Sequence, residues 1–547
     1  MNRGAFSGRG WRGAVLIVAA MLSVAWFWRF QIAGGFTHGF GDPYDAMIEV
    51  SVLQHWDNVL LGREAWNATA YFAPASDTLG YNDGYLVSGL IYAVWRWLGL
   101  PMTVAAEAMH ATFKVAGFFG MYLLLSRCCR TRFGWSVWGA VLFTVADMTL
   151  QHAHHGQFFA LALVPFVALF GWQAVLACVR GQRAPLLRWG LAFAAGFAAL
   201  AMTSFYLAWF LGLFLIVLVA IAGAAGWRHW RDVVRAAKRQ WLPLLAVALA
   251  GFVLLLPMLC VYLPKARETG MHGFAYLRPS ILWPVELINV GPGNALWSWL
   301  VSAMRSGMAP GLRTNRDLVF GMPPLFLVLA LVAVLRAQRV GSPSAMAWIG
   351  LALLVGWLLM LDFGGGLLPW RVVYAVVPGA GTIRIVGRFA LLLLVPAVML
   401  LTVFLDRMRH ARIALLLAGS LLIEQTATSA PVDLDHREQA AMIAGIPAPP
   451  ARCRLVAVRS ARSQYRAIYP EYDLLYAHNV DAMVLAELFS RPTINGVATF
   501  APPGWDFADP NRDDYWSRVA AYASRHRLSG LCALDIGRGV IWAPLTR

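Results

Sequence analysis

Two carboxylates stand three residues apart in the segment Gly41-Asp42-Pro43-Tyr44-Asp45. Glu49 follows Asp45 by four residues, so the two side chains share a face if this stretch is helical. His38 lies close by in the sequence. Carboxylates held together in this way can act as a general base toward a hydroxyl, or they can hold a divalent cation. Asp42 and Asp45 are therefore the first candidates for catalysis, and His38 is a candidate for substrate or metal binding.

A structural role competes with chemistry at Asp42. Asp is favoured at a helix N-cap and Pro at the first helical position, so we expect a helix over about 43–61 that Asp42 caps. The surrounding stretch 33–84 holds seven acidic residues and one basic residue, in a chain with 45 Lys+Arg against 28 Asp+Glu. We expect Asp57, Glu64 and Asp83 to lie on a solvated face. Asp77 is expected in a structured turn, and it is also a candidate for substrate or metal contact.

Three histidines fall within four residues in the segment 151–157, just after Asp147. Imidazole nitrogens at this density can contact a metal or a phosphate. His152, His154 and His155 are therefore candidates for substrate or metal binding. A purely interfacial histidine cluster is the alternative interpretation.

Two pairs of basic residues are candidates for binding a phosphate. Arg384 and Arg388 are four residues apart and follow a Gly-rich turn whose N–H groups could also bind phosphate oxygens. Lys265 and Arg267 form the second pair, at the end of an apolar run. Arginine recognises phosphate through two parallel N–H bonds. The alternatives are snorkelling arginines at a helix end for the first pair and an interfacial anchor for the second.

The composition shows what must position these residues. Hydrophobic residues make up 59% of the 547 and charged residues 13%, against about 45–50% and 25% in soluble domains. This excludes a soluble enzyme and a disordered chain and indicates a polytopic membrane protein, mainly α-helical. Runs long enough to span a bilayer lie at about 14–32, 103–125, 133–150, 158–179, 187–203, 207–225, 241–263, 318–335, 345–361, 387–405 and 411–429.

The basic residues between these runs set the expected orientation. Arginines concentrate in alternate connecting segments, and such segments are cytoplasmic by the positive-inside rule. All of them fall on one side only if 85–100, which carries Arg96 between two tryptophans, is an interfacial helix and not a twelfth span. We therefore expect eleven spans, a cytoplasmic N-terminus and an external C-terminus. The formal charge of +17 is then distributed over topology anchors and predicts no nucleic-acid partner.

This orientation predicts two domains. Residues 1–430 form the transmembrane module, with external loops at 33–102 and 264–317. Residues 431–547 form a small external α/β domain, with β-like runs at 454–458 and 540–542 and a helical stretch at about 513–524. Cys453 and Cys532 both lie in this domain, where a disulfide could persist; two buried thiols are the alternative.

The order of these features resembles the GT-C-fold membrane glycosyltransferases, which use polyprenyl-phosphate-linked sugars. The resemblance rests on the anchor span, the GDPYD segment, the aromatic loop with Phe72-Ala73-Pro74 and the amphipathic stretch 85–100, and it covers about residues 14–430. It implies that Asp42, or else Asp45, is the acidic residue of the first loop that acts on the acceptor hydroxyl. It also implies that the leaving polyprenyl phosphate needs cationic partners, for which the candidates are Arg384, Arg388, Lys265 and Arg267.

The predicted function is therefore transfer of a sugar from a polyprenyl-phosphate donor to a lipid- or envelope-linked acceptor. It would take place at the periplasmic face of a bacterial inner membrane, among membrane lipids, with a divalent cation (Mg²⁺ or Mn²⁺) as the possible cofactor. A transporter or lipid-linked saccharide flippase is the alternative. Transporters carry ionisable residues at mid-span, and here Glu107 and Lys114 are the main charges within a predicted span. A receptor or scaffold leaves the acidic first loop unexplained.

Overall fold

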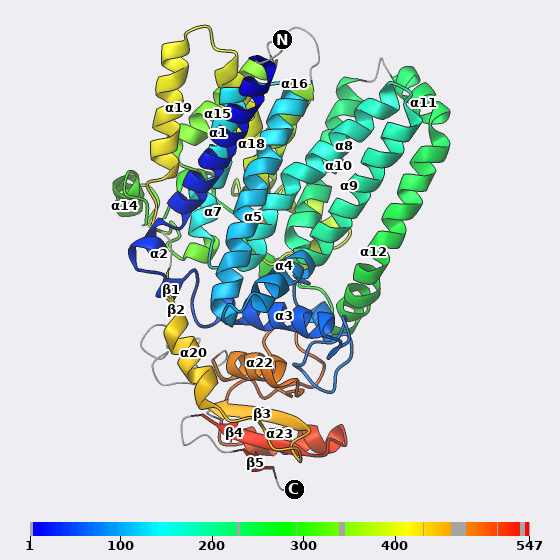
Figure 1. Cartoon of the computed structure of the whole chain (residues 1–547), viewed down its shortest axis with the longest axis vertical. Coiled ribbons are helices and arrows are strands. Elements are labelled where there is room, and N and C mark those ends of the chain that lie inside the picture. The colour runs from blue at the N-terminus through cyan, green and yellow to red at the C-terminus, as the bar shows by residue number, and fades with distance from the viewer. Residues whose placement is uncertain are drawn as a thin grey trace.

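Helices dominate the computed structural model, and the two ends of the chain lie at opposite ends of an elongated molecule (Figure 1). The structure describes residues 4–226, 230–291, 293–338, 345–429, 432–460, 477–510, 512–536 and 542–545. A bundle of long helices makes up the part that holds the N-terminus. A small domain with a sheet makes up the part that holds the C-terminus.

Each of the eleven predicted apolar runs falls on a helix. Within the described residues, eight helices are long and apolar enough to cross a membrane, while α15 and α16 are apolar but shorter. The helices on the eleven runs are α1 (Gly4–Phe27), α5 (Met102–Leu124), α6 (Phe133–Thr144) with α7 (Asp147–Gln151), η3 (Gly156–Leu163) with α8 (Val164–Val179), α9 (Arg183–Thr203), α10 (Phe205–Ala225), α12 (Trp241–Thr269), α15 (Pro324–Gln338), α16 (Ala345–Leu359), α18 (Phe389–Asp406) and α19 (Ala411–Gln425).

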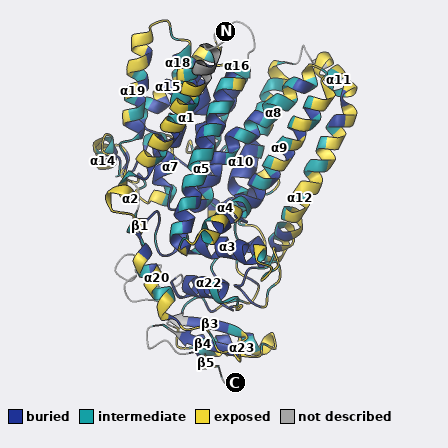
Figure 2. Ribbon diagram, in the orientation of Figure 1, coloured by how far each residue is buried: buried dark blue, intermediate teal, exposed yellow. Residues whose placement is uncertain are grey.

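Helix α18 forms the centre of the bundle. Nearly all its residues are buried, whereas α12 is largely exposed along its length (Figure 2). Before its last turn, the exposed side chains of α12 are apolar, among them Leu249 and Phe252. A helix with an apolar surface of this kind is stable only where hydrocarbon surrounds it.

The stretch 85–100 does not add a span. Helix α4 (Leu86–Trp97) has twelve residues, too few to cross a bilayer. It packs against α3 (Asp45–Leu60), which lies across the end of the bundle nearest the C-terminal domain (Figure 1). Trp56 fixes this contact, since its ring lies directly over Gly89 and its Nε1 donates to the Gly84 carbonyl at 2.6 Å. A side chain at position 89 would collide with that ring.

The first-loop helix begins two residues later than the sequence predicts. Helix α3 starts at Asp45, not at Pro43. Asp42 lies ahead of it and its Oδ1 accepts hydrogen bonds from the N–H groups of Tyr44 and Asp45, at 2.8 and 2.9 Å. The carboxylate thus satisfies N–H groups at the start of the helix, as an N-terminal Asp does.

Shorter elements occupy the connecting segments. Helix α2 (Arg29–Ala33) follows α1, and the amphipathic α11 (Trp230–Arg239) lies at the end of the bundle that holds the N-terminus (Figure 1). The others are η1 (Thr78–Tyr81), η2 (Leu125–Cys129), α13 (Phe274–Leu277), η5 (Arg278–Ser280), η6 (Pro284–Ile288), α14 (Ser298–Ser306), η7 (Arg316–Leu318), α17 (Trp370–Val376), η8 (Ala380–Thr382) and η9 (Val386–Arg388).

The C-terminal domain is a small α/β unit. Strand β3 (Leu455–Ser460) runs parallel to β4 (Leu531–Asp535), which pairs antiparallel with β5 (Ala543–Pro544). Cys453 and Cys532 form a disulfide beside these strands. The predicted strand at 454–458 matches β3; of the predicted strand at 540–542, residues 540 and 541 lie outside the described residues. The helices are α20 (His436–Gly445), α22 (Ala477–Phe489) and α23 (Tyr515–Arg525).

Strand pairing and helix packing both fasten this domain to the first loop. Strand β1 (His38–Gly39) pairs antiparallel with β2 (Leu434–Asp435). Helix α22 packs on α3, where the fully buried Glu487 accepts hydrogen bonds from Asn58 and from the Ala70 N–H. Burial, with the adjacent Glu64, raises the pKa of Glu487 well above its usual value.

The expected solvated face for three first-loop acids is wrong. Asp57 is 5% exposed and accepts from Gln54 and Trp97. Glu64 binds the buried His55 at 2.8 Å. Asp83 accepts from the Phe205 N–H at 2.8 Å. Trp97 and Phe205 come from other helices, and a count of charges along the sequence does not report such contacts.

Candidate active site

A cavity of about 610 Å³ opens where the first loop, the bundle and the C-terminal domain meet. Asp42 and Asp45 reach it from the start of α3, and His154 and His155 from the turn between α7 and η3. Arg384 and Arg388 reach it from the segment before α18. Six of the predicted site residues, from three distant segments, therefore line one cavity. Other lining residues include Asp83, Tyr85, Gln157, Tyr206, Asn315, Arg316, Asp317, Asp433 and Thr499.

His155 stands at the centre of a chain of ionisable groups. Its Nδ1 lies 3.2 Å from Asp45 Oδ2 and its Nε2 lies 3.1 Å from Asp317 Oδ1. His154 Nε2 lies 2.8 Å from the same Asp317 oxygen, and its Nδ1 lies 3.2 Å from the Gln151 carbonyl. The backbone carbonyl accepts only from an N–H, which places a proton on His154 Nδ1. Its Nε2 faces a carboxylate oxygen, so that contact needs a further proton on one of those two atoms.

Burial and charge act in opposite directions on this chain of groups. Burial disfavours the charged form of His155, but its hydrogen bonds to Asp317 and Asp45 outweigh this and raise its pKa. For Asp45 and Asp317 burial likewise opposes ionisation, and the hydrogen bonds to the histidines hold each pKa below its usual value. The pKa of His154 is lowered by burial and by the neighbouring His155. The two carboxylates on either side of His155 therefore favour its imidazolium form.

Asp42 differs from its neighbour Asp45. Burial raises the pKa of Asp42 to about 7, and the negative charge of Asp45 adds to the shift, while the N–H groups of Tyr44 and Asp45 oppose it. Two carboxylates in one cavity whose pKa values are pushed apart are an arrangement suited to acid–base chemistry. Asp42 exchanges a proton near neutral pH, and Asp45 remains charged.

Two arginines also line the cavity, and Arg388 Nη2 lies 3.4 Å from His155 Nε2. Arg388 is 6% exposed, and its guanidinium lies over the rings of Phe158 and Tyr206, 5.0 and 5.1 Å from their centroids. The Arg384 N–H donates to the Tyr206 hydroxyl at 2.9 Å. Burial raises the pKa of Asp83 to about 6, against the opposing charges of Arg388 and Arg384. An anionic group in the cavity would meet the two arginines together with the Asp83 carboxyl.

Neither Lys265 nor Arg267 lines this cavity. Lys265 is buried, and its Nζ donates to the Tyr81 hydroxyl at 3.0 Å and to Glu268 at 2.8 Å. Arg267 is exposed on α12. The Gly-rich turn at 379–381 also lies apart, with Gly379 packed on Trp209. The last turn of α12 is thus tied to the first loop by Lys265.

Three further candidates have other partners. His38 Nε2 lies 3.8 Å from Asp435 at the β1–β2 pair. Asp77 precedes η1 and accepts from the Asn67 side chain. His152 is buried, stacks on Phe320 with ring centroids 4.3 Å apart, and its Nε2 lies 2.9 Å from the Val319 carbonyl.

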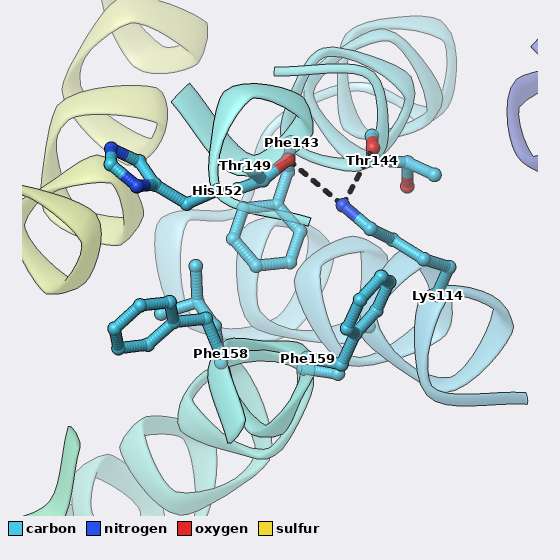
Figure 3. Close-up of a pocket in the computed structure, with 10 residues that line it drawn as sticks. Lys114, Phe143, Thr144, Thr149, His152, Phe158 and Phe159 are labelled. Atoms are coloured by element: carbon cyan, nitrogen blue, oxygen red, sulfur yellow. Dashed lines mark hydrogen bonds between the residues drawn. The ribbon is translucent and has the colours of Figure 1, made fainter. Parts of the chain in front are cut away.

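Lys114 of α5, one of the two main charges of a predicted span, lies beside a small cavity of about 20 Å³ that His152 also lines (Figure 3). Its Nζ donates to the Thr149 hydroxyl at 2.8 Å and to the Thr144 carbonyl at 3.2 Å. Glu107, the other charge, accepts from the Trp28 indole at 2.8 Å. A cavity of this size has room for about one water molecule.

Sequence reasoning missed several residues of the larger cavity. Asp317 was not assigned a role, although it contacts both histidines. Asp83, Asp433 and Thr499 come from a loop or from the C-terminal domain. No motif marks these positions. The only available signal was that Asp317 and Asp83 lie in loops predicted to face the same side of the membrane.

Comparisons with known proteins give little further support. No family model matches the chain, and no curated protein matches it. Among solved structures, the chain is similar to ArnT from Cupriavidus metallidurans bound to undecaprenyl phosphate, with 13% sequence identity and a TM-score of 0.36. The similarity covers 90% of this chain and 86% of that one. By its own helices and composition, the chain is a multi-pass membrane protein with a mainly helical fold.

Proposed function

We propose that the chain is a bacterial inner-membrane glycosyltransferase of the GT-C type. It transfers a sugar from a polyprenyl-phosphate donor to a lipid- or envelope-linked acceptor at the periplasmic face. The observation that carries this proposal is a single cavity lined both by a carboxyl with a pKa near 7 and by two arginines. A base for the acceptor hydroxyl and cations for a leaving phosphate are the two requirements of such a transfer.

The residues take the following parts in this reaction. Asp42 accepts the proton of the acceptor hydroxyl, whose oxygen attacks C1 of the sugar with inversion. The bond from C1 to the phosphate oxygen breaks, and polyprenyl phosphate leaves with the electron pair. Arg384 and Arg388 bind its phosphate. Asp45, paired with His155, keeps a negative charge beside Asp42 and so raises the pKa of that carboxyl.

Two features support the proposed orientation. The Arg-rich segments 127–132 and 180–188 lie at the end of the bundle that holds the N-terminus, as expected of a cytoplasmic face. The disulfide lies in the C-terminal domain, and three of the free cysteines, Cys128, Cys129 and Cys178, lie toward the other end. Disulfides persist in the periplasm and thiols in the cytoplasm.

The charges within the spans favour this proposal over a transporter. Lys114 and Glu107 each have neutral hydrogen-bond partners, and the cavity beside Lys114 holds about one water. A transport pathway needs ionisable groups along a route that a substrate can follow. The large cavity instead lies at one end of the bundle, beside the C-terminal domain.

A transfer assay tests the proposal. Purified protein would receive radiolabelled polyprenyl-phosphate sugars and an envelope lipid extract, and labelled products would be separated and counted. Transfer of label to an acceptor is expected. If no donor gives a labelled product with fresh, folded protein, the assignment as a glycosyltransferase is wrong.

The pH dependence of transfer follows from Asp42. The base form of this carboxyl is needed, and its pKa is raised to about 7, so the rate should rise with pH through about 7 and then level off. In Asp45→Asn the neighbouring negative charge is lost, and the rising limb of the residual activity should move to lower pH. Rates measured from about pH 5 to 9 in both proteins would show this. A profile that is flat across this range contradicts a base of this kind.

We further propose that a divalent cation binds beside Asp42. The side chains of His154, His155 and Asp317 offer ligand atoms within 4.8 Å of one another, and each histidine has a second nitrogen bonded to an oxygen acceptor, as metal-binding histidines do. Two imidazoles suit Mn²⁺ better than Mg²⁺, which prefers oxygen ligands. When bound, the cation supplies positive charge for a developing anion.

Removal of metal should therefore abolish transfer. After dialysis against a chelator, Mn²⁺ is expected to restore activity and Mg²⁺ to restore much less. Elemental analysis should find bound Mn²⁺ in the wild type and less in His154→Ala, which gives a readout that does not depend on activity. Full activity after exhaustive chelation would show that transfer needs no cation at these residues.

A further inference from the structure

A second cavity, an apolar groove of about 520 Å³, lies among the helices toward the end of the bundle that holds the N-terminus. Its lining is apolar and comes mainly from α8, α10 and α18, with α9 and α11 beside them. Trp172, Val179, Phe214 and Met399 are typical lining residues. The volume lies within the range of about 300–1,000 Å³ that ligand sites occupy. Its ligand must be a hydrocarbon chain, because the lining offers almost only hydrocarbon.

Buried aromatic rings separate this groove from the active site. Phe210 and Phe389 are fully buried and stack with their ring centroids 5.1 Å apart. Along α10 and α18 they lie between Tyr206 and Arg388, which line the larger cavity, and the residues that line the groove. A lipid in the groove therefore enters from one end of the bundle, and the proposed donor binds at the other end.

A cation lies at the mouth of the groove. The Arg239 guanidinium packs so closely on Gly181 that a Cβ at position 181 would lie 1.8 Å from its Nη2. Gly181 follows Val179 of the groove lining by two residues, and the charge of Arg239 also reaches Cys178, another lining residue. The head group of a lipid in the groove would meet this guanidinium first.

Helix α11 lies over this mouth of the groove. Val233 and Ala236 line the groove, although Val233 is also exposed, and the basic residues Arg231, Arg235, Lys238 and Arg239 are all exposed. The three segments around the mouth, 127–132, 180–188 and 230–239, contain a single acidic residue, Asp232, which lies 2.6 Å from Arg235. Basic pockets between helices at this face of a membrane attract anionic head groups.

We propose that the groove binds an acyl chain of an anionic phospholipid from the adjacent leaflet, with the lipid phosphate on Arg239. The proposal rests on an apolar groove whose mouth is positively charged, a combination that matches both parts of such a lipid. It is independent of the glycosyltransferase assignment, because the groove and the active site share no lining residue. The bound lipid would hold α11 against α8.

Lipid binding by the full-length protein tests this proposal. Delipidated protein would be titrated with phosphatidylglycerol or with phosphatidylcholine of the same acyl chains, and bound lipid would be counted by native mass spectrometry. Phosphatidylglycerol is expected to bind more tightly. Arg239→Gln should weaken its binding about fivefold, since one basic residue near a membrane surface contributes about a factor of five. Arg235→Gln removes the same charge from the same helix, but from a side chain paired with Asp232, and should leave binding unchanged.

Each other outcome overturns the proposal. Equal binding of the two lipids would show a groove filled by any acyl chain. Equal losses in Arg239→Gln and Arg235→Gln would show attraction to the whole face. If added polyprenyl phosphate displaced the bound phosphatidylglycerol, the groove would instead be the binding site for the polyprenyl chain of the donor. Ala174→Trp fills the groove and should abolish lipid binding. Thermal unfolding would show whether this variant folds. If it does not fold, the two arginine variants still decide the test.

Discussion

Replacing Asp42 with asparagine is expected to lower the rate of sugar transfer about 100- to 10,000-fold, the usual contribution of a general base. The substitution removes the ionisable group and little else. The amide oxygen of asparagine can still accept the N–H groups of Tyr44 and Asp45, so the start of α3 keeps its hydrogen bonds. Single-turnover rates with a labelled donor would measure the loss, and thermal unfolding would show whether the fold is kept.

Matched variants of the same loop decide which carboxylate acts. Asp77→Asn makes the same chemical change outside the cavity, where Asp77 bonds to Asn67, and should retain transfer. Asp45→Asn breaks the pair with His155 and should reduce transfer less than Asp42→Asn does. An active Asp42→Asn together with an inactive Asp45→Asn would assign the base to Asp45. Activity in both variants would remove the acidic first loop from the reaction.

The sequence predicts the fold well because the bilayer restricts what an apolar run can do. A run of about 20 apolar residues has to be a helix in hydrocarbon, and all eleven runs are helices. The stretch 85–100 shows that residue types can also distinguish an interfacial helix from a span. Arg96 and its tryptophan neighbours indicated an interfacial helix, and α4 lies against α3 at the end of the bundle.

The site is predicted only in part, because the same residue types serve chemistry and packing. In the sequence, Lys265 and Arg384 are equally good candidates for binding phosphate, because both are cations near a helix end. Only the structure shows that Lys265 is engaged by Tyr81 and Glu268, whereas Arg384 lines the cavity. Asp317 could not be assigned, because its role depends on two histidines more than 160 residues away. Contacts of that kind depend on how loops meet, which periodicity does not encode.

Arg388→Ala is expected to reduce kcat/KM for the donor at least about 30-fold, the equivalent of about 2 kcal/mol, because removing one partner of a buried charged contact costs that much or more. Arg388→Lys keeps the charge but loses the forked N–H groups that match a phosphate, so its activity should be intermediate. Initial rates over a range of donor concentrations would separate KM from kcat, and the loss should lie mainly in the KM for the donor.

The second cationic pair supplies the control for this prediction. Arg267 is an exposed arginine at the same end of the bundle but outside the cavity, so Arg267→Gln should bind donor normally. Lys265→Met should instead lower the temperature of unfolding, since it leaves the Glu268 carboxylate and the Tyr81 hydroxyl without their shared partner. If Arg267→Gln raised the KM for the donor and Arg388→Ala did not, the phosphate would bind at the end of α12. Arg384 and Arg388 would then have to bind the acceptor.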